Sequence, residues 1–179
     1  MKELSLHILD LARNSIDAEA NVVKIKIVEN TNEDLLSIEI EDDGKGMDEE
    51  LLEKATDPFT TTRNTRKVGL GLPLAKEAAK HCGGDFVLQS VKGKGTRVYF
   101  SFKHSHIDRA PLGDMGESIM SLINSERNVD IYYEHVYNSN VFVFDTKKIK
   151  NMLVDLDIKN PQVLIWIKEY INDNVKKLQ

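Results

Sequence analysis

Cysteine, long apolar runs and clusters of positive charge are all scarce in this chain of 179 residues. A single cysteine, Cys82, excludes an internal disulfide, and the neighbouring His81 does not complete a metal site. No segment has an apolar run of bilayer length, and the N-terminus MKELSLHILDLARNS lacks the apolar centre of a signal peptide. We therefore expect a cytoplasmic protein that does not interact with a membrane.

The charge balance also excludes a class of partner. The formal net charge is -5, with 24 Lys and Arg against 29 Asp and Glu, and no basic block is present. Binding to nucleic acid draws on counterion release by clustered Lys and Arg, so we expect no nucleic-acid partner. The remaining composition, 41% apolar and 30% charged, is typical of a globular protein with a real core.

Residues 4–18 have the periodicity of a helix with two different faces. The apolar stripe consists of Leu4, Ile8, Leu9, Ala12 and Ile16. The polar stripe consists of His7, Asp10, Asn14 and Asp17, at steps of three and four residues. Such a stripe in isolation is typical of a solvated helix face, and a packed or helix-capping role is the simplest interpretation of His7.

The next elements are short and well punctuated. Alternating residues predict a β-hairpin over 23–40, and the glycine-rich turn 41–46 leads into a short helix at 48–55. Residues 57–68 lack periodicity and predict a mobile basic loop. A helix over 72–81, with Pro73 in its first turn and Gly83 after its end, precedes a second hairpin at 86–102.

Three features of these segments suit a magnesium nucleotide. Asn14 can supply the one helix amide that Mg²⁺ needs beside phosphate oxygens. Asp42, at a strand end before Gly44 and Gly46, can accept a hydrogen bond from an amino group of a planar base. Gly69 and Gly71 precede a helix, so backbone N–H groups and a positive dipole end can face phosphates.

Four motifs in this order resemble the histidine-kinase-like ATPase family (the GHKL or Bergerat type), which includes sensor histidine kinases, anti-sigma-factor kinases, gyrase, Hsp90 and the mismatch-repair ATPases. The motifs are Asp10 to Ala18, Asp42-Asp43-Gly44-Lys45-Gly46, Pro58 to Arg63 with Gly69-Leu70-Gly71-Leu72, and Gly93-Lys94-Gly95-Thr96. Each alone is a weak signal, whereas four in sequence on the required elements favour nucleotide binding strongly. The third motif is similar to the lid and glycine box of sensor kinases in particular.

The resemblance implies a role for each matching residue. Asp10 would orient water or an attacking group, Asn14 would ligate Mg²⁺, and Asp42 would bind adenine beside Thr96. Asp17 would either reach the Mg²⁺ shell through water or hold the helix against the glycine box, and the two interpretations weigh equally. The remaining expected ATP-binding residues are Gly44, Gly46, Thr61, Thr62, Arg63, Lys67, Gly69, Leu70, Gly71 and Leu72, with Arg66 as a further cation. We expect residues 60–68 to become protected when a triphosphate is bound.

The sequence departs from the family pattern in three places. Residue 10 is Asp where catalytically active members usually have Glu, and residue 67 is Lys where sensor kinases usually have glycine. Only nine residues precede Asp10, so we expect no helical hairpin with a phosphoacceptor histidine and no autophosphorylation in cis.

The rest of the chain carries no resemblance. We expect an ATP-binding domain at 1–103, a linker at 104–116 and a small α+β appendage at 117–179. The appendage should contain a helix at 117–123, an aromatic hairpin at 131–144 and helices at 146–153 and after Pro161. The simplest interpretation of the hairpin is a small satellite core.

The predicted fold is a two-layer α/β sandwich of the Bergerat type, with the helices of Asp10 and Leu72 on one face of a mixed sheet. The predicted function is a regulatory module that binds ATP and Mg²⁺ and acts as a protein kinase in trans on a protein partner. Two alternatives remain: a non-catalytic ATP-dependent switch for protein interaction, and a slow ATPase. A homodimer is one further assembly that the resemblance allows.

Overall fold

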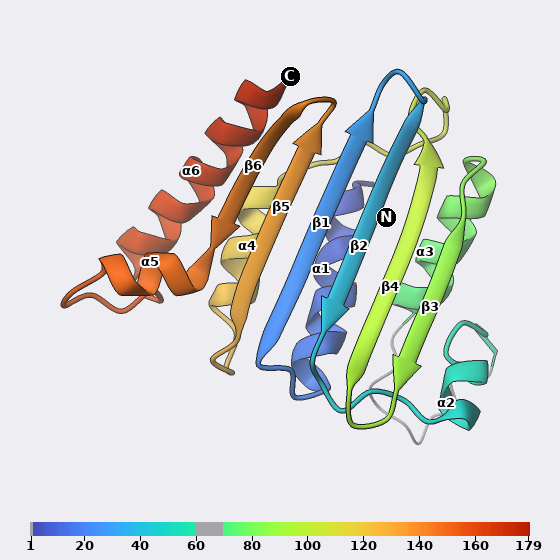
Figure 1. Ribbon diagram of the computed structural model, residues 1–179, viewed down its shortest axis with the longest axis horizontal. Helices are drawn as coiled ribbons and strands as arrows, with labels where there is room; N and C mark the ends of the chain where they lie inside the picture. The colour runs from blue at the N-terminus through green and yellow to red at the C-terminus, as the bar shows by residue number, and fades with distance from the viewer. Residues whose placement is uncertain (1, 60–69) are drawn as a thin grey trace.

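A computed structural model describes residues 2–59 and 70–179. Its strands form one six-stranded sheet in the order β3-β4-β2-β1-β5-β6, with helices packed on one face (Figure 1). The strands are β1 (Val22–Asn30), β2 (Leu35–Asp42), β3 (Phe86–Val91), β4 (Gly95–Lys103), β5 (Asp130–Tyr137) and β6 (Asn140–Asp145). The helices are α1 (Leu4–Asp17), α2 (Glu49–Lys54), α3 (Gly71–His81), α4 (Met115–Ile123), α5 (Thr146–Met152) and α6 (Pro161–Leu178). The expected two-layer α/β sandwich is confirmed, since sheet and helices form separate layers.

Helix α1 buries the apolar face that its periodicity predicts. Ile8, Ala12 and Ile16 are buried against the sheet, whereas Leu9 is only partly buried and Leu11 takes its place in the core. His7 is buried and packed, and its Nδ1 has no hydrogen-bond partner among the described residues. Burial therefore lowers the pKa of His7.

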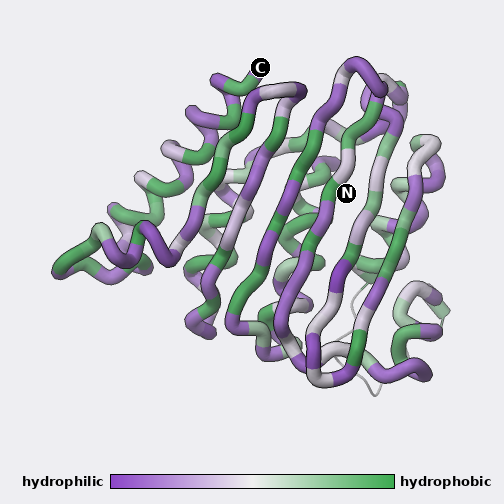
Figure 2. Tube along the Cα trace, in the orientation of Figure 1, coloured by the Kyte–Doolittle hydropathy of each residue, from purple (hydrophilic) through white to green (hydrophobic). Residues whose placement is uncertain are grey.

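The sheet has one apolar and one polar face because its side chains alternate. Along β1, Val23, Ile25 and Ile27 point to the helices, while Lys24 and Lys26 lie on the open face. Figure 2 shows this alternation as changing hydropathy along the strand. Lys26 forms an ion pair with Glu134 on β5 at 2.9 Å, so the open face carries paired charges across strands.

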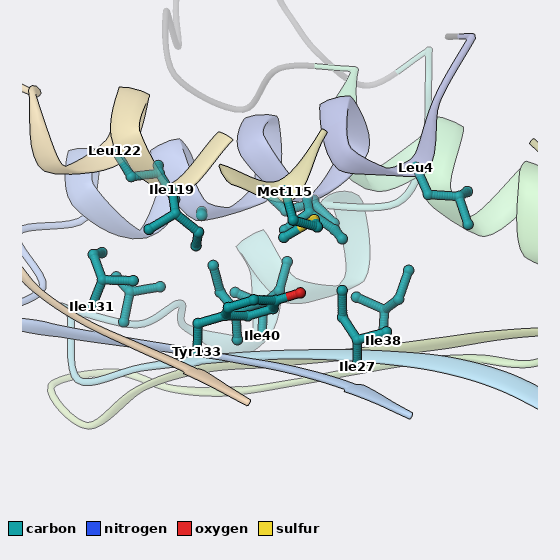
Figure 3. Close-up of a cluster of buried hydrophobic side chains, with 14 of the residues drawn as sticks. Leu4, Ile27, Ile38, Ile40, Met115, Ile119, Leu122, Ile131 and Tyr133 are labelled. Atoms are coloured by element: carbon teal, nitrogen blue, oxygen red, sulfur yellow. The ribbon is translucent and has the colours of Figure 1, made fainter. Parts of the chain in front are cut away.

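The hydrophobic core is shared by the two ends of the chain. Figure 3 shows Ile27, Ile38 and Ile40 of the sheet facing Met115 and Ile119 of α4. Residues from α1, α3, α4, α6 and the strands β1, β2, β4, β5 and β6 belong to one buried cluster, and the partly buried Phe86 and Leu88 of β3 pack against it. A separate satellite core is therefore the wrong expectation for the aromatic hairpin, whose strand β5 pairs in parallel with β1 and extends the sheet.

The segment expected as a linker is held against the sheet at several points. His104 Nε2 and His135 Nε2 each lie 2.9 Å from the carboxylate of the buried Glu29, and Tyr133 Oη lies 2.8 Å from His135 Nδ1. Further along, the backbone N–H of Leu4 donates to the carbonyl of Pro111. The last two residues of the expected linker, 115–116, already form the first turn of α4. None of the helices in the described ranges is long and apolar enough to cross a membrane.

Candidate functional site

A cavity of about 420 Å³ opens between α1, the turn after β2, and the start of α3. Its apolar walls are Leu11, Met47, Leu51, Leu72 and Val98. Its polar lining consists of Asn14, Ser15, Asp17, Asp42, Lys45 and Thr96. A largely apolar cavity with a few polar groups suits a planar ring held in place by one or two hydrogen bonds.

Asp42 is the buried acid of this cavity. Its Oδ2 accepts a hydrogen bond of 2.6 Å from Ser15 Oγ, and its Oδ1 accepts one of 2.8 Å from the backbone N–H of Gly44. The sheet register places Asp42 between Val23 on β1 and Thr96 on β4. Since each carboxylate oxygen can accept more than one hydrogen bond, Asp42 keeps acceptor capacity for a ligand.

The turn after β2 is packed so closely against its surroundings that one position in the turn and one at the start of β4 require glycine. Gly46 has a φ of 63°, and a Cβ there would lie 2.1 Å from the carbonyl oxygen of Val91. Gly95 has a φ of 115°, and a Cβ there would lie 1.9 Å from the carbonyl oxygen of Asp42. A side chain at either position would push the two backbones apart, so these glycines fix the floor of the cavity.

Backbone hydrogen bonds hold this turn to its neighbours. The N–H of Lys45 donates to the carbonyl of Ala18 at the end of α1, and the N–H of Met47 donates to Ser90 Oγ. Ser90 Oγ also lies 2.8 Å from Thr96 Oγ1. The same contacts that close the turn therefore position Thr96 beside Asp42.

The start of α3 faces the polar stripe of α1. A Cβ built on Gly71 would lie 3.6 Å from Asp10 Cβ and 3.8 Å from Asn14 Nδ2. The N-terminal turn of α3, with its positive dipole end, thus lies next to Asn14 and Asp10. This end of the cavity can attract an anion, with the amide of Asn14 within reach.

The structure brings together most of the described residues that the sequence singled out. Asn14, Asp17, Asp42, Gly46, Leu72 and Thr96 line the cavity. The backbone N–H of Gly44 donates a hydrogen bond to Asp42. Gly71 and Asp10 lie at the open end of the cavity, and Leu70 is exposed just before α3. Thr61, Thr62, Arg63, Arg66, Lys67 and Gly69 lie outside the described residues.

The sequence analysis missed several lining residues. Ser15 was detectable, because it is a polar residue on the buried side of α1 that follows Ala12 by three positions. Lys45 falls inside the second motif but carried no role of its own. Leu11, Met47, Leu51 and Val98 gave no signal, since apolar residues at these spacings are typical of any core.

Comparisons with known proteins agree with this geometry. Residues 2–106 match the model of the family described as "Histidine kinase-, DNA gyrase B-, and HSP90-like ATPase". The sensor histidine kinase WalK of Bacillus subtilis is 36% identical over 91 residues, which cover 48% of this chain and 15% of WalK. The peroxide stress-activated histidine kinase mak2 of Schizosaccharomyces pombe is 38% identical over 99 residues, covering 52% of this chain and 4% of mak2. The chain thus spans a small part of these relatives' length.

Two solved structures share the fold at low sequence identity. The Aquifex aeolicus MutL ATPase domain complexed with ADP has a TM-score of 0.50 and 14% identity, and the match covers 81% of this chain and 63% of that one. The N-terminal domain of a DNA repair protein has a TM-score of 0.52 and 16% identity, covering 80% and 52%. Both matches cover more of this chain than residues 2–106, so they include part of the C-terminal region. This agrees with a single sheet that contains the C-terminal strands.

Proposed function

The chain belongs to the histidine kinase-, DNA gyrase B- and HSP90-like ATPase family, and from that premise we propose that it binds ATP with Mg²⁺ and phosphorylates a partner protein in trans. The observation that carries the proposal is the buried Asp42 carboxylate on the floor of an apolar cavity whose other end meets a helix N-terminus. The sensor kinases among its relatives favour transfer to a protein over simple hydrolysis.

Asp42 is the proposed adenine acceptor. Its carboxylate is held by Ser15 and Gly44 and is buried, so it is pre-positioned for an amino group that enters the cavity. Met47, Leu72 and Val98 supply the apolar walls for the ring, and Thr96 offers a hydroxyl beside it. A buried carboxylate selects adenine over guanine, because guanine presents a carbonyl oxygen where adenine presents a donor.

Asn14 is the proposed Mg²⁺ ligand, because its amide lies beside the start of α3, where an anion is attracted. Bound Mg²⁺ would neutralise phosphate charge and draw electron density from the transferred group. Asp17, also in the cavity lining, can act through water on the same ion or hold α1 in place. The lid residues 60–68 would add cations from Arg63, Arg66 and Lys67.

Asp10 is the proposed base, since it lies on the polar stripe one turn before Asn14 and against Gly71. Its carboxylate would accept the proton of the attacking side chain of the partner as that side chain bonds to the γ-phosphorus of ATP. The bond from this phosphorus to the bridging oxygen breaks in the same step, and ADP leaves with the negative charge. Because Asp is one methylene shorter than the Glu usual in the family, we expect slow transfer.

Two other activities remain candidates. A non-catalytic switch would use ATP to order residues 60–68 and so create a protein-binding surface. A slow ATPase would release phosphate to water, and the fold shared with a MutL ATPase domain favours retaining this candidate.

Incubation with γ-labelled ATP and Mg²⁺, alone and with cell extract, separates the three activities. Label on a second protein supports the kinase, free phosphate supports the ATPase, and binding without either supports the switch. Asp42→Asn protein, assayed at an ATP concentration below the wild-type Kd, serves as the control for contaminating enzymes, because its weaker ATP binding should lower any activity that depends on this cavity about tenfold. Label transfer that persists unchanged with this variant would refute the proposal.

A further inference from the structure

A second cavity lies between α5 and α6. Figure 1 shows these two helices at the opposite end of the sheet from α2. This α5–α6 groove has a volume of about 340 Å³ and is lined by Ile149, Met152, Leu153, Gln162, Val163 and Trp166. It takes no part in the proposed function, because none of its residues lines the nucleotide cavity.

The groove is surrounded by apolar side chains that remain in contact with water. Trp166 stacks on Tyr170 with ring centroids 5.0 Å apart, yet 47% of Trp166 is exposed. The last residue of α5, Met152, is 74% exposed, and Val154 in the connection to α6 is 90% exposed. Leu156, Ile165 and Tyr170 are the other exposed members. Together these six side chains present on the order of 700 Å² of surface, above the usual largest patch of a monomer and close to one side of a standard interface.

We propose that this surface is the interface of a homodimer in which two copies of the chain are related by a two-fold axis. The groove and the protruding residues lie together, since Val154 and Leu156 closely follow Met152 and Leu153, which line the groove. A two-fold axis places the protruding connection of one copy in the groove of the other, and the reverse contact forms at the same time. A second copy therefore supplies both the protrusion and the cavity that receives it.

The groove is a favourable place to bury apolar surface. Five of its six lining residues are apolar, so water in the groove gains few hydrogen bonds from the walls. The release of such water on association is favourable for the same reason that core formation is.

Three charges on α5 and α6 beside the groove are also self-complementary, in addition to the exposed Asp155 and Asp157 of the connection between these helices. Lys148 on α5 is exposed, four residues before Met152, and it forms no ion pair with any residue in the described ranges. Glu169 and Asp173 on α6 are exposed on the same helix face as Trp166, and neither forms an ion pair within 2–59 or 70–179. When a two-fold axis brings α5 of one copy opposite α6 of the other, the cation faces the anions, twice per dimer.

Sedimentation equilibrium of the full chain over a wide concentration range tests this interface. We expect a monomer–dimer equilibrium, and Trp166→Glu and Val154→Glu should each raise the dimer Kd at least about thirtyfold. Val87→Glu is the matched control: Val87 is 40% exposed on β3 at the other sheet edge, so the same substitution should leave the Kd unchanged. Far-UV circular dichroism and calorimetric ATP binding on the same samples show that each variant is folded, and ATP affinity should not change with dimer loss.

Charge reversal tests the two-fold arrangement separately. Lys148→Glu should raise the dimer Kd several-fold, and combining it with Glu169→Lys in the same chain should restore most of the affinity. A wild-type chain that stays monomeric at all concentrations overturns the proposal. Assemblies that grow beyond two copies, or equal effects of Trp166→Glu and Val87→Glu, overturn it as well.

Discussion

Replacing Asp42, the buried acid of the cavity proposed to bind ATP, by its amide gives the most direct test of the site. In the wild type, both oxygens of Asp42 accept hydrogen bonds, from Ser15 Oγ at 2.6 Å and from the Gly44 N–H at 2.8 Å. Asp42→Asn keeps the shape but has one oxygen and one NH₂ group. The oxygen must face the Gly44 N–H, because two N–H groups cannot pair, so the NH₂ group replaces Oδ2 beside Ser15.

The expected magnitudes follow from this exchange. Hydrogen bonds to a charged group contribute about 1.5–3 kcal/mol and neutral ones about 0.5–1.5 kcal/mol, so the variant should lose about 1–2 kcal/mol of unfolding free energy and remain folded. A similar loss of acceptor strength toward adenine lowers ATP affinity about tenfold. The ratio of ATP affinity to GTP affinity should fall, because the new NH₂ group can donate a hydrogen bond to the guanine carbonyl.

Isothermal titration calorimetry with ATP and GTP measures these changes, and Asp43→Asn is the matched control. Asp43 accepts the backbone N–H groups of Asn21 and Val22 at 2.8 and 2.9 Å outside the cavity. Hydrogen bonds from Val22 and Asn21 outweigh the burial of Asp43 and lower its pKa, so this variant should lose some stability while keeping its nucleotide preference. Equal ATP and GTP affinities in the wild type, or an unchanged ATP affinity in Asp42→Asn, would exclude Asp42 from adenine recognition.

Six further variants test the site and the fold. Gly46→Ala should lose several kcal/mol of stability or fail to fold, because its Cβ would overlap a backbone carbonyl of β3. Gly71→Ala should have a normal melting temperature, measured by thermal unfolding, but should bind ATP more weakly. Asn14→Ala should lose the Mg²⁺-dependent part of ATP affinity, and equal losses with Mg²⁺ and with chelator would refute its role as ligand. Asp10→Glu should raise the rate of phosphate transfer or release by up to about a hundredfold, whereas Asp10→Asn should leave the ATP affinity nearly unchanged. A Glu variant slower than the wild type would show that the site is built around the shorter acid. Burial raises the pKa of Glu29, but hydrogen bonds from two histidines outweigh this effect and hold the pKa below its usual value. The ionised Glu29 therefore stabilises the folded protein above about pH 4.3, and this stabilisation is lost as the pH falls through the folded-state pKa. Glu29→Gln should therefore unfold in less urea at neutral pH and show a weaker acid dependence than the wild type; parallel curves would contradict this.

The sequence alone determined the order of the elements and several of the segments that line the larger cavity. Helical spacing in residues 4–18 set the face of Asn14 and Asp17, and the glycines of 41–46 and 93–96 marked turns that close backbone contact requires. These features are local, because periodicity and the left-handed conformation of glycine depend on residues only a few positions apart.

Only the tertiary structure decided which distant segments share a surface. Ser15 reaches Asp42 across 27 positions of sequence, and β5 lies beside β1 although more than 90 residues separate them in the chain. Alternating apolar residues in β5 were equally compatible with a satellite core and with the main sheet, since alternation defines the buried face of a strand and not its neighbour. The α5–α6 groove likewise depends on how two helices meet, and its exposed Trp166 differs from a core tryptophan only in what the fold leaves uncovered.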